Sequence, residues 1–273
     1  QLAGMFAAMD GEQMAATMDS TFMVEAAGMM SFEDLKGMDG DSAFGMFEAM
    51  GSDTTMASLE GDQLAGMFAA MEGDQLASLG GEGLVDAFVN MGADNAASMG
   101  GANLAEMLGA MGGEGLGQLD PTALEDAAKA MDGENMLQLG ADAALGMFET
   151  LGAENAAATF TGDQLGGIFG ALDPTDIGTT ISPEVLLEST EKMTIEHFAN
   201  VGGEQAGAMF EALGSDQVLE MGGEQVAGMF SAMQGDQLSD LGGATVAEAI
   251  VAMGTENAID MGAGNIAEVV ESL

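Results

Sequence analysis

The chain has no cysteine, tryptophan, tyrosine or arginine, and it has a single histidine among 273 residues. Without cysteine there is no disulfide and no thiolate metal site, and the redox compartment stays open. The other absences remove phenolic acids, indole platforms for sugars and bidentate clamps for oxyanions. His197 has only Thr194 and Glu196 close by in sequence, at no known triad spacing. We therefore expect a structural role for His197, no catalytic residues and no enzymatic activity.

Positive charge is almost absent, since three lysines (Lys36, Lys129 and Lys192) face 46 acidic residues, for a formal charge of −43. Nucleic acids and anionic membranes need a basic surface, so both are excluded as partners. No apolar run approaches the length of a transmembrane segment. Screening such a charge takes about 0.5–1 M salt, at which the Debye length is about 3–4 Å. This favours an extracellular or cell-surface location in a marine or halophilic setting; the alternative is that acidity only keeps the chain soluble.

What the chain does contain is a repeat of 20 or 21 residues, rich in glycine and methionine. Each unit is predicted to form two short helices, and each helix closes on a large apolar residue. The longer helices close at Met9, Met30, Met50, Met71, Met91, Met111, Met131, Leu151, Leu172, Met193, Leu213, Met233, Met253 and Leu273. The shorter helices close at Met18, Met38, Leu59, Leu79, Met99, Leu119, Leu139, Phe160, Ile181, Val201, Met221, Leu241 and Met261.

Helix ends are marked by glycine and proline. A closing residue is often followed by two glycines, of which the first suits a left-handed C′ position and the second a cap of the next helix. These pairs begin at Gly80, Gly100, Gly202, Gly222 and Gly242. Each of the three prolines lies two residues after a closing residue, behind Asp120, Asp173 or Ser182. This predicts an N-cap followed by proline at the first helical position.

Such short helices are unstable alone in water, so they must pack on their neighbours. Leu64, Phe68 and Met71 form one apolar stripe, and small residues between them allow close approach. We expect an all-α, right-handed α-solenoid of about 13 to 14 two-helix repeats. It would be one continuous array over residues 1–273 and a portion of a longer chain, with a degenerate repeat at 173–200 that either bends, docks a partner or has simply diverged.

An amide follows many closing residues by four positions. Stacked amides are expected to bond one another along the array or to return to first-turn backbone donors. A row of ligand-binding amides is the alternative. The series comprises Gln13, Gln63, Gln75, Asn95, Asn103, Asn135, Asn155, Gln205, Gln217, Gln225, Gln237, Asn257 and Asn265.

Paired carboxylates around a glycine are the only candidates for metal sites, because hard cations prefer oxygen ligands. None fits the twelve-residue calcium loop, so we expect no cofactor and Ca²⁺ or Mg²⁺ bound diffusely rather than at discrete sites. The candidate ligands are Asp39, Asp41, Glu60, Asp62, Glu72, Asp74, Asp132 and Glu134.

The stripe of Leu64, Phe68 and Met71 and the Gly-Asp-Gln helix starts resemble, in repeat style, the cytoplasmic amino-terminal domain of bacterial magnesium transporters. That resemblance implies a superhelix of short helices that senses divalent ions.

Together these features favour a structural or assembly protein, a segment of an acidic extracellular or cell-surface fibre. A divalent-cation-responsive regulatory domain and a protein-binding scaffold remain as alternatives. Apolar residues near both ends predict end-to-end self-association. They are Leu2, Met5, Phe6 and Met9 at one end and Ile266, Val269, Val270 and Leu273 at the other.

Overall fold

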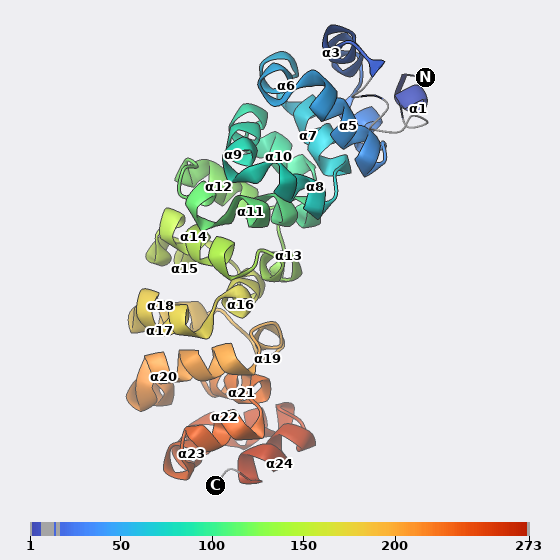
Figure 1. Ribbon diagram of the computed structural model, residues 1–273. Coiled ribbons are helices and arrows are strands. Elements are labelled where there is room, and N and C mark those ends of the chain that lie inside the picture. The colour runs from blue at the N-terminus through green and yellow to red at the C-terminus, as the bar shows by residue number, and fades with distance from the viewer. Residues whose placement is uncertain (1, 7–13, 15–16, 272–273) are drawn as a thin grey trace. The chain divides into compact units, whose positions relative to one another are not determined.

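The regular secondary structure of the described residues is all helical. The computed structural model describes all residues except 1, 7–13, 15–16 and 272–273, and in this part of the chain it holds 23 helices and no strand (Figure 1). None of the described helices combines the length and the apolar character needed to cross a bilayer. The all-α prediction is confirmed. Of the predicted closing residues and amides, Met9, Gln13 and Leu273 lie outside the described residues.

The helices divide into two compact units, Gln1–Met131 and Asp132–Leu273. The first unit contains α1 (Leu2–Phe6), α3 (Ser20–Gly28), α4 (Phe32–Lys36), α5 (Gly40–Met50), α6 (Ser52–Ser58), α7 (Gly61–Ala70), α8 (Gly73–Ser78), α9 (Gly80–Met91), α10 (Ala93–Ser98), α11 (Gly101–Leu116) and α12 (Pro121–Ala128).

The second unit contains α13 (Gly133–Leu137), α14 (Ala141–Leu151), α15 (Ala153–Thr159), α16 (Gly162–Ala171), α17 (Pro174–Thr180), α18 (Pro183–Glu191), α19 (Ile195–Phe198), α20 (Gly203–Glu220), α21 (Gly223–Ala232), α22 (Gly235–Asp240), α23 (Gly243–Asp260) and α24 (Ala263–Glu271). The long elements α11, α20 and α23 each join two helices across one non-helical glycine: Gly112, Gly214 or Gly254.

Proline marks helix starts as the sequence predicts. Pro121, Pro174 and Pro183 are each the first residue of a helix. The side chains of Asp120 and Asp173 accept first-turn N–H groups at 2.9–3.2 Å, and Ser182 caps α18 in the same way. The segment 173–200 therefore keeps the helical order of the rest of the chain, as α17, α18 and α19.

Helices three apart in the chain pack side by side. In the first unit α4 packs on α7, α7 on α10 and α8 on α11; in the second α13 packs on α16, α15 on α18 and α17 on α20. Contacting residues in such pairs are about 30 residues apart, as the 30-residue separation of Gly133 and Asp163 illustrates. The sequence repeats every two helices, whereas packing joins helices that are three apart. One packing turn therefore corresponds to about one and a half sequence repeats.

The closing residues form the core. All twelve described closing residues of the longer helices are buried, from Met30 to Met253. In the shorter series Met18, Leu79 and Leu241 are half-buried and the others are buried. Phenylalanines three residues before a closing residue pack against each other in consecutive repeats, with ring centroids 5.6 Å apart for Phe47 and Phe68. The prediction of the apolar stripe is confirmed.

Some of the glycines at helix starts are packing residues, which corrects one expectation. The first glycine of most Gly-Gly pairs has a positive φ, for example 98° at Gly100, but Gly222 does not. The second is not a cap but a helical residue, and at Gly81, Gly203 and Gly223 a backbone carbonyl from about 30 residues further on packs against it. A Cβ on Gly81 would lie 2.8 Å from the carbonyl oxygen of Met111. At Gly81 and Gly223 the close carbonyl leaves no room for a side chain.

Candidate functional site

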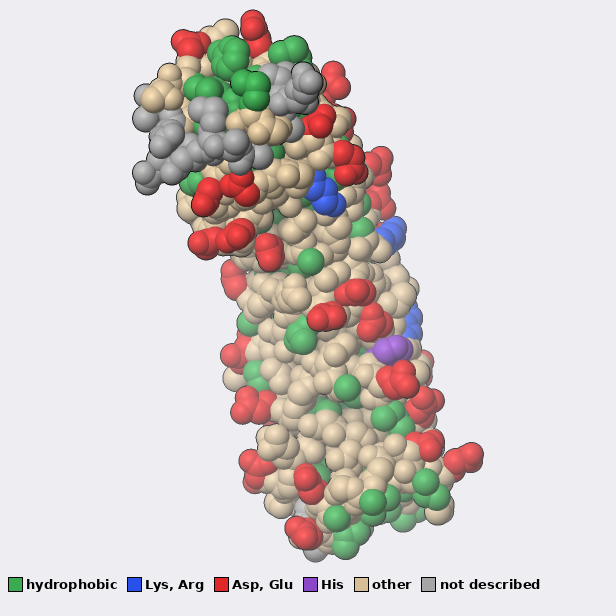
Figure 2. Space-filling model, turned by 90° about the vertical axis from the view of Figure 1, so that its right-hand side faces the viewer, with side chains coloured by type: hydrophobic (Ala, Val, Ile, Leu, Met, Phe, Trp, Pro, Cys, Tyr) green, Lys and Arg blue, Asp and Glu red, His purple; other side chains and the backbone are tan. Residues whose placement is uncertain are grey.

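The eight candidate metal ligands all lie exposed at helix starts. Asp39, Glu60, Glu72 and Asp132 are N-caps, and Asp41, Asp62, Asp74 and Glu134 belong to the first turns of the same helices. In both units, acidic side chains are spread over the visible face rather than gathered at one place (Figure 2). First-turn carboxylates stabilise helices through the exposed backbone N–H groups and the helix dipole.

Asp39 shows how these carboxylates are used. Its Oδ1 accepts the backbone N–H of Ser42 at 3.0 Å, and its Oδ2 accepts the Ser42 hydroxyl at 2.7 Å. The Ser42 hydroxyl, aided by backbone N–H groups, holds the pKa of the Asp39 carboxyl below its usual value, while partial burial opposes the shift. Asp39 is therefore a helix cap whose charged form is stabilised.

Within the described residues, no three His, Asp or Glu side chains gather in a geometry that would hold a metal ion. The structure instead gives one predicted ligand another partner, since Asp41 Oδ1 accepts the side-chain amide of Gln75 at 2.9 Å. A second link between helix starts joins the carboxylate of Asp163 to the backbone N–H of Gly133 at 2.6 Å. These carboxylates bind neighbouring helices of the same unit.

The amide series makes the most informative contacts. Gln63 is 9% exposed. Its Oε1 accepts the N–H of Glu60, the N-cap of its own helix, at 3.0 Å. Its Nε2 donates to the carbonyl oxygens of Gly28 at 2.9 Å and Met30 at 3.0 Å, where α3 ends. One side chain thus satisfies backbone groups at two helix ends, which have no intrahelical partners.

The same contact recurs at other long-helix amides. The side chains of Asn103, Gln205 and Gln225 donate to carbonyls 32 to 34 residues earlier, those of Ala69, Leu172 and Met193, at 3.1–3.2 Å. Asn95, Asn257 and Asn265 instead donate to the carbonyl four residues before them, at 2.9 Å.

Of the two alternatives predicted for the amides, the structure shows the return to backbone N–H groups. The return to first-turn donors is confirmed at Glu60, Glu72 and Gln234, whose N–H groups each donate to the amide oxygen three residues later. Between helices, the side chains of Gln63, Asn103, Gln205 and Gln225 donate to backbone carbonyls and that of Gln75 donates to a carboxylate. Helix ends present carbonyls, and an amide nitrogen is the donor that they lack.

His197 has a structural position. It lies four residues after the closing residue Met193, which is the position of the amides in other repeats, and four residues before the next closing residue, Val201. Its Nδ1 accepts the backbone N–H of Thr194 at 3.1 Å. A Cβ on Gly162 would lie 2.7 Å from this Nδ1, so the imidazole packs on the start of α16. Its place in the repeat could have predicted from the sequence that its side chain bonds the start of its own helix, as the amides do.

Two of the three lysines bind backbone carbonyls. Lys192 donates to Ala157 and, at 2.7 Å, to Ala158, both in the last turn of α15. Lys36 donates to the carbonyl of Met99 at 3.2 Å. Cations are favourable at the negative end of the helix dipole, and these contacts could not be predicted from sequence spacing.

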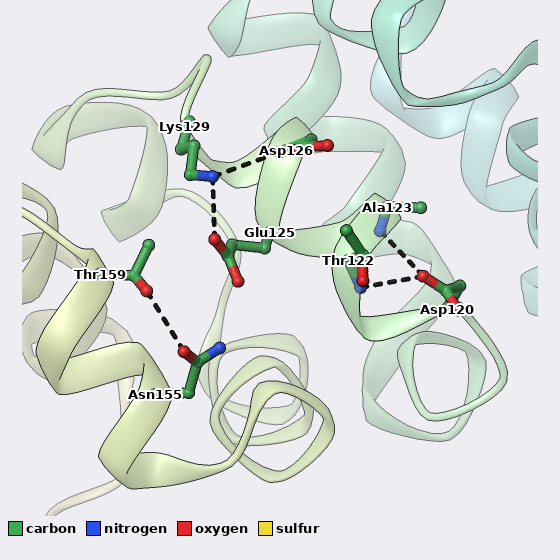
Figure 3. A network of polar contacts seen from close by, with 8 residues as sticks. All are labelled: Asp120, Thr122, Ala123, Glu125, Asp126, Lys129, Asn155 and Thr159. Atoms are coloured by element: carbon green, nitrogen blue, oxygen red, sulfur yellow. Dashed lines mark hydrogen bonds and ion pairs between the residues drawn. The ribbon is translucent and has the colours of Figure 1, made fainter.

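Lys129 differs, because it is the exposed C-cap of α12 and pairs with Glu125 at 2.8 Å and Asp126 at 3.2 Å (Figure 3). The hydrogen bonds to Glu125 and then to Asp126 raise the pKa of Lys129. A surface pair of this kind adds little stability.

A shallow hollow of about 680 Å³ lies over α17, α20 and α22 in the second unit. Its lining includes the small residues Gly178, Gly207 and Ala208 and the acidic residues Glu204, Glu211 and Asp240. The hollow lies partly over the degenerate segment 173–200.

No known family matches this chain. Models of protein families find no match in it, and curated proteins show no similar sequence. Its function therefore has to be argued from the contacts described above.

Proposed function

We propose that the chain is a non-enzymatic structural repeat protein, a right-handed α-solenoid that assembles end to end into an acidic filament at the cell surface or outside the cell. The observation that carries the proposal is the contact between helix ends. Amides such as Gln63 and Gln225, in different units, link helices 32 to 36 residues apart by the same hydrogen bond. The recurring amide side chains of this sequence thus connect successive turns of the helix array.

A linear array suits a fibre because its free energy of folding is the sum of the stability of each repeat and of the contacts between neighbouring repeats. Such a sum sets no limit to the number of repeats. The buried closing residues supply the neighbour term in both units. Few lysines and no arginine also leave few sites for trypsin-like proteases. This composition fits an exposed and long-lived material.

The charge supports the saline setting and gives a test. Exposed carboxylates of successive turns repel each other, and salt screens that repulsion. The melting temperature should therefore rise steeply between 10 mM and 1 M NaCl. A melting temperature that does not change with salt would contradict the argument that repulsion opposes stacking.

Assembly itself is tested by light scattering against protein concentration at 1 M NaCl, with electron microscopy of the same samples. We expect light scattering to show a particle mass that rises with protein concentration. Electron microscopy should show filaments whose width is that of a single chain. A chain that stays monomeric at every concentration would remove the proposal.

The scaffold alternative is favoured by one observation, the hollow over α17, α20 and α22. It would apply if the chain is monomeric and retains a partner there. The cation-responsive alternative has its own test: a saturable rise in melting temperature with millimolar calcium, beyond that of sodium at matched ionic strength, would indicate discrete sites.

A further inference from the structure

The hollow over α17, α20 and α22 lies along one row of packed helices. The three helices are three apart in the chain when the two halves of α20 are counted separately, and α17 packs on α20 and α20 on α22 (Figure 1). Every residue that lines the hollow is described and belongs to the second unit. The last two helices, α23 and α24, contribute nothing to the lining. The hollow is therefore formed by helices inside the unit.

Two glycines of the lining have no neighbour in their own unit that requires glycine. Gly178 lies inside α17 and Gly207 inside α20; neither has a positive φ, and a Cβ on either would meet no described atom within 4 Å. Gly166 is at the same repeat position as Gly207, six residues before a closing residue, but there a Cβ would lie 2.5 Å from the carbonyl oxygen of His197. Glycine inside a helix is less stable than alanine. Gly178 and Gly207 carry this cost without the close contact that explains Gly166.

The face of α20 in the hollow is small and apolar. Where α20 has Gly207 and Ala208, the preceding long helix α18 has Leu187 and Glu188 at the same repeat positions. Ala212 extends this face, since helical residues four apart lie on the same side. A surface without large side chains lets the backbone of another helix approach to packing distance.

The α22 side of the hollow adds an unusual closing residue. Leu241 is half-buried, whereas most closing residues of the shorter helices are buried, and it lines the hollow. A partner with an apolar face would cover Leu241 as neighbouring helices cover the other closing residues. Removing this apolar surface from water favours binding.

The charges of the lining are all negative. Glu204 and Glu211 come from α20 and Asp240 from α22, and all three are exposed. The lining includes no lysine or histidine. A partner that enters the hollow brings its edges close to these carboxylates, so lysine or arginine on those edges would be favourable and acidic residues unfavourable.

The chain's own cations cannot supply that charge. It has three lysines and no arginine. Lys36 and Lys192 donate to backbone carbonyls, and Lys129 pairs with acidic residues of its own helix. Charge complementarity therefore favours a different protein over a second copy of this chain.

We infer that the hollow over α17, α20 and α22 binds a helix of another protein, with an apolar face and with lysine or arginine at both edges of that face. The part of α20 that lines the hollow runs from Glu204 to Ala212, about 12 Å at 1.5 Å per residue, so it matches two to three turns of the partner. The inference goes beyond the proposed function, because a single chain carries the whole surface whether or not copies assemble.

The test uses two synthetic peptides of about 14 residues, or about four helical turns. Both have the same composition of alanine, leucine and lysine. One peptide places alanine and leucine on one helical face and lysine at its edges, and in the other the order is shuffled so that no apolar face forms. Titration calorimetry with the full chain in 0.5 M NaCl, at a Debye length of about 4 Å, reduces general attraction to its negative charge. We expect one site per chain and at least tenfold tighter binding of the amphipathic peptide.

Gly207→Leu tests whether the peptide occupies the hollow. The leucine would fill it, and because no described atom lies within 4 Å of that Cβ and leucine favours a helix, the melting temperature should stay the same or rise. We expect the affinity for the amphipathic peptide to fall at least tenfold.

A second pair of variants tests the charges. Glu204→Gln with Glu211→Gln removes two carboxylates of the lining and should weaken binding by about fivefold. Glu188→Gln with Glu224→Gln is the matched control, since it removes the same charge from exposed residues of the same unit that do not line the hollow. The control should bind like the unmodified chain.

Equal affinity for the two peptides, or no binding of the amphipathic one up to about 1 mM, would overturn the inference. Unchanged binding by Gly207→Leu, or equal losses in the two charge variants, would overturn it as well, because the peptide would then bind elsewhere or through total charge. The proposed function is unaffected by these results, since its test measures assembly of the unmodified chain without peptide.

Discussion

Four copies of Gly-Asp-Gln-Leu start helices in this chain, and alanine at their glycines should give opposite results. At Gly61 a Cβ would lie 2.4 Å from the carbonyl oxygen of Met91 and 2.7 Å from Nδ2 of Asn95. At Gly73 the nearest atom would be Cδ of Glu106 at 3.5 Å, an ordinary contact. The same substitution in the same four-residue context thus meets a backbone carbonyl in one helix and only an ordinary side-chain contact in the other.

The magnitudes follow from these distances. Gly61→Ala requires the backbone at Met91 to move by about 1 Å, and overpacking of this kind costs about 1–3 kcal/mol. Gly73→Ala meets no such obstacle and should stabilise by about 0.4–1 kcal/mol, because alanine restricts the unfolded chain and favours a helix. The two variants should therefore differ by roughly 1.5–4 kcal/mol, with opposite signs relative to the unmodified chain.

Urea unfolding followed by circular dichroism measures the difference. Amide hydrogen exchange locates it, because Gly61→Ala should weaken protection at the end of α9. Gly235→Ala is a further control, since no atom lies within 4 Å of that Cβ. If Gly61→Ala proved as stable as Gly73→Ala, the close approach of α7 and α9 would be wrong.

Three further outcomes are expected. Gln63→Glu keeps the shape but loses the donor to the carbonyls that end α3, and should cost about 1–3 kcal/mol in urea unfolding; Gln118→Glu, on an exposed amide, should change little. Met71→Asp should cost several kcal/mol by burying a charge, whereas Glu72→Gln should be tolerated, and equal tolerance would mean that the core face is misassigned. The lowered pKa of Asp39 means that its stabilising effect is complete above about pH 4 and is lost as the pH falls further. Urea midpoints of the unmodified chain and of Asp39→Asn should therefore differ above pH 4 and converge below it; a constant difference would refute the role of the ionised cap.

The core was predictable from the sequence because closing residues repeat with the helices themselves. Met71 and Leu172 could be placed inside by spacing alone, and Pro121 could be placed at a helix start by its chemistry. The packing partners were not predictable in the same way. Gly61 and Gly73 have identical neighbours in sequence, and their surroundings are set by residues about 30 positions away.

The functional part of the prediction is weaker for the same reason. The carboxylate pairs were visible as a pattern, but whether Asp41 faces a cation or the amide of Gln75 depends on the helix packed against it. The contacts of Lys192 with the end of α15 likewise join segments more than 30 residues apart.

The mismatch between a two-helix repeat and packing between every third helix has a consequence for how such chains can change in length. Adding one sequence repeat adds two helices, about two thirds of a three-helix turn, and would rotate everything beyond the insertion by about 240°. The surfaces on either side of it would then face different directions. Only insertion or deletion of about 60 residues, three sequence repeats and two full turns, preserves their relative orientation. Length variants of this protein whose surfaces keep their relative orientation should therefore differ by multiples of three sequence repeats.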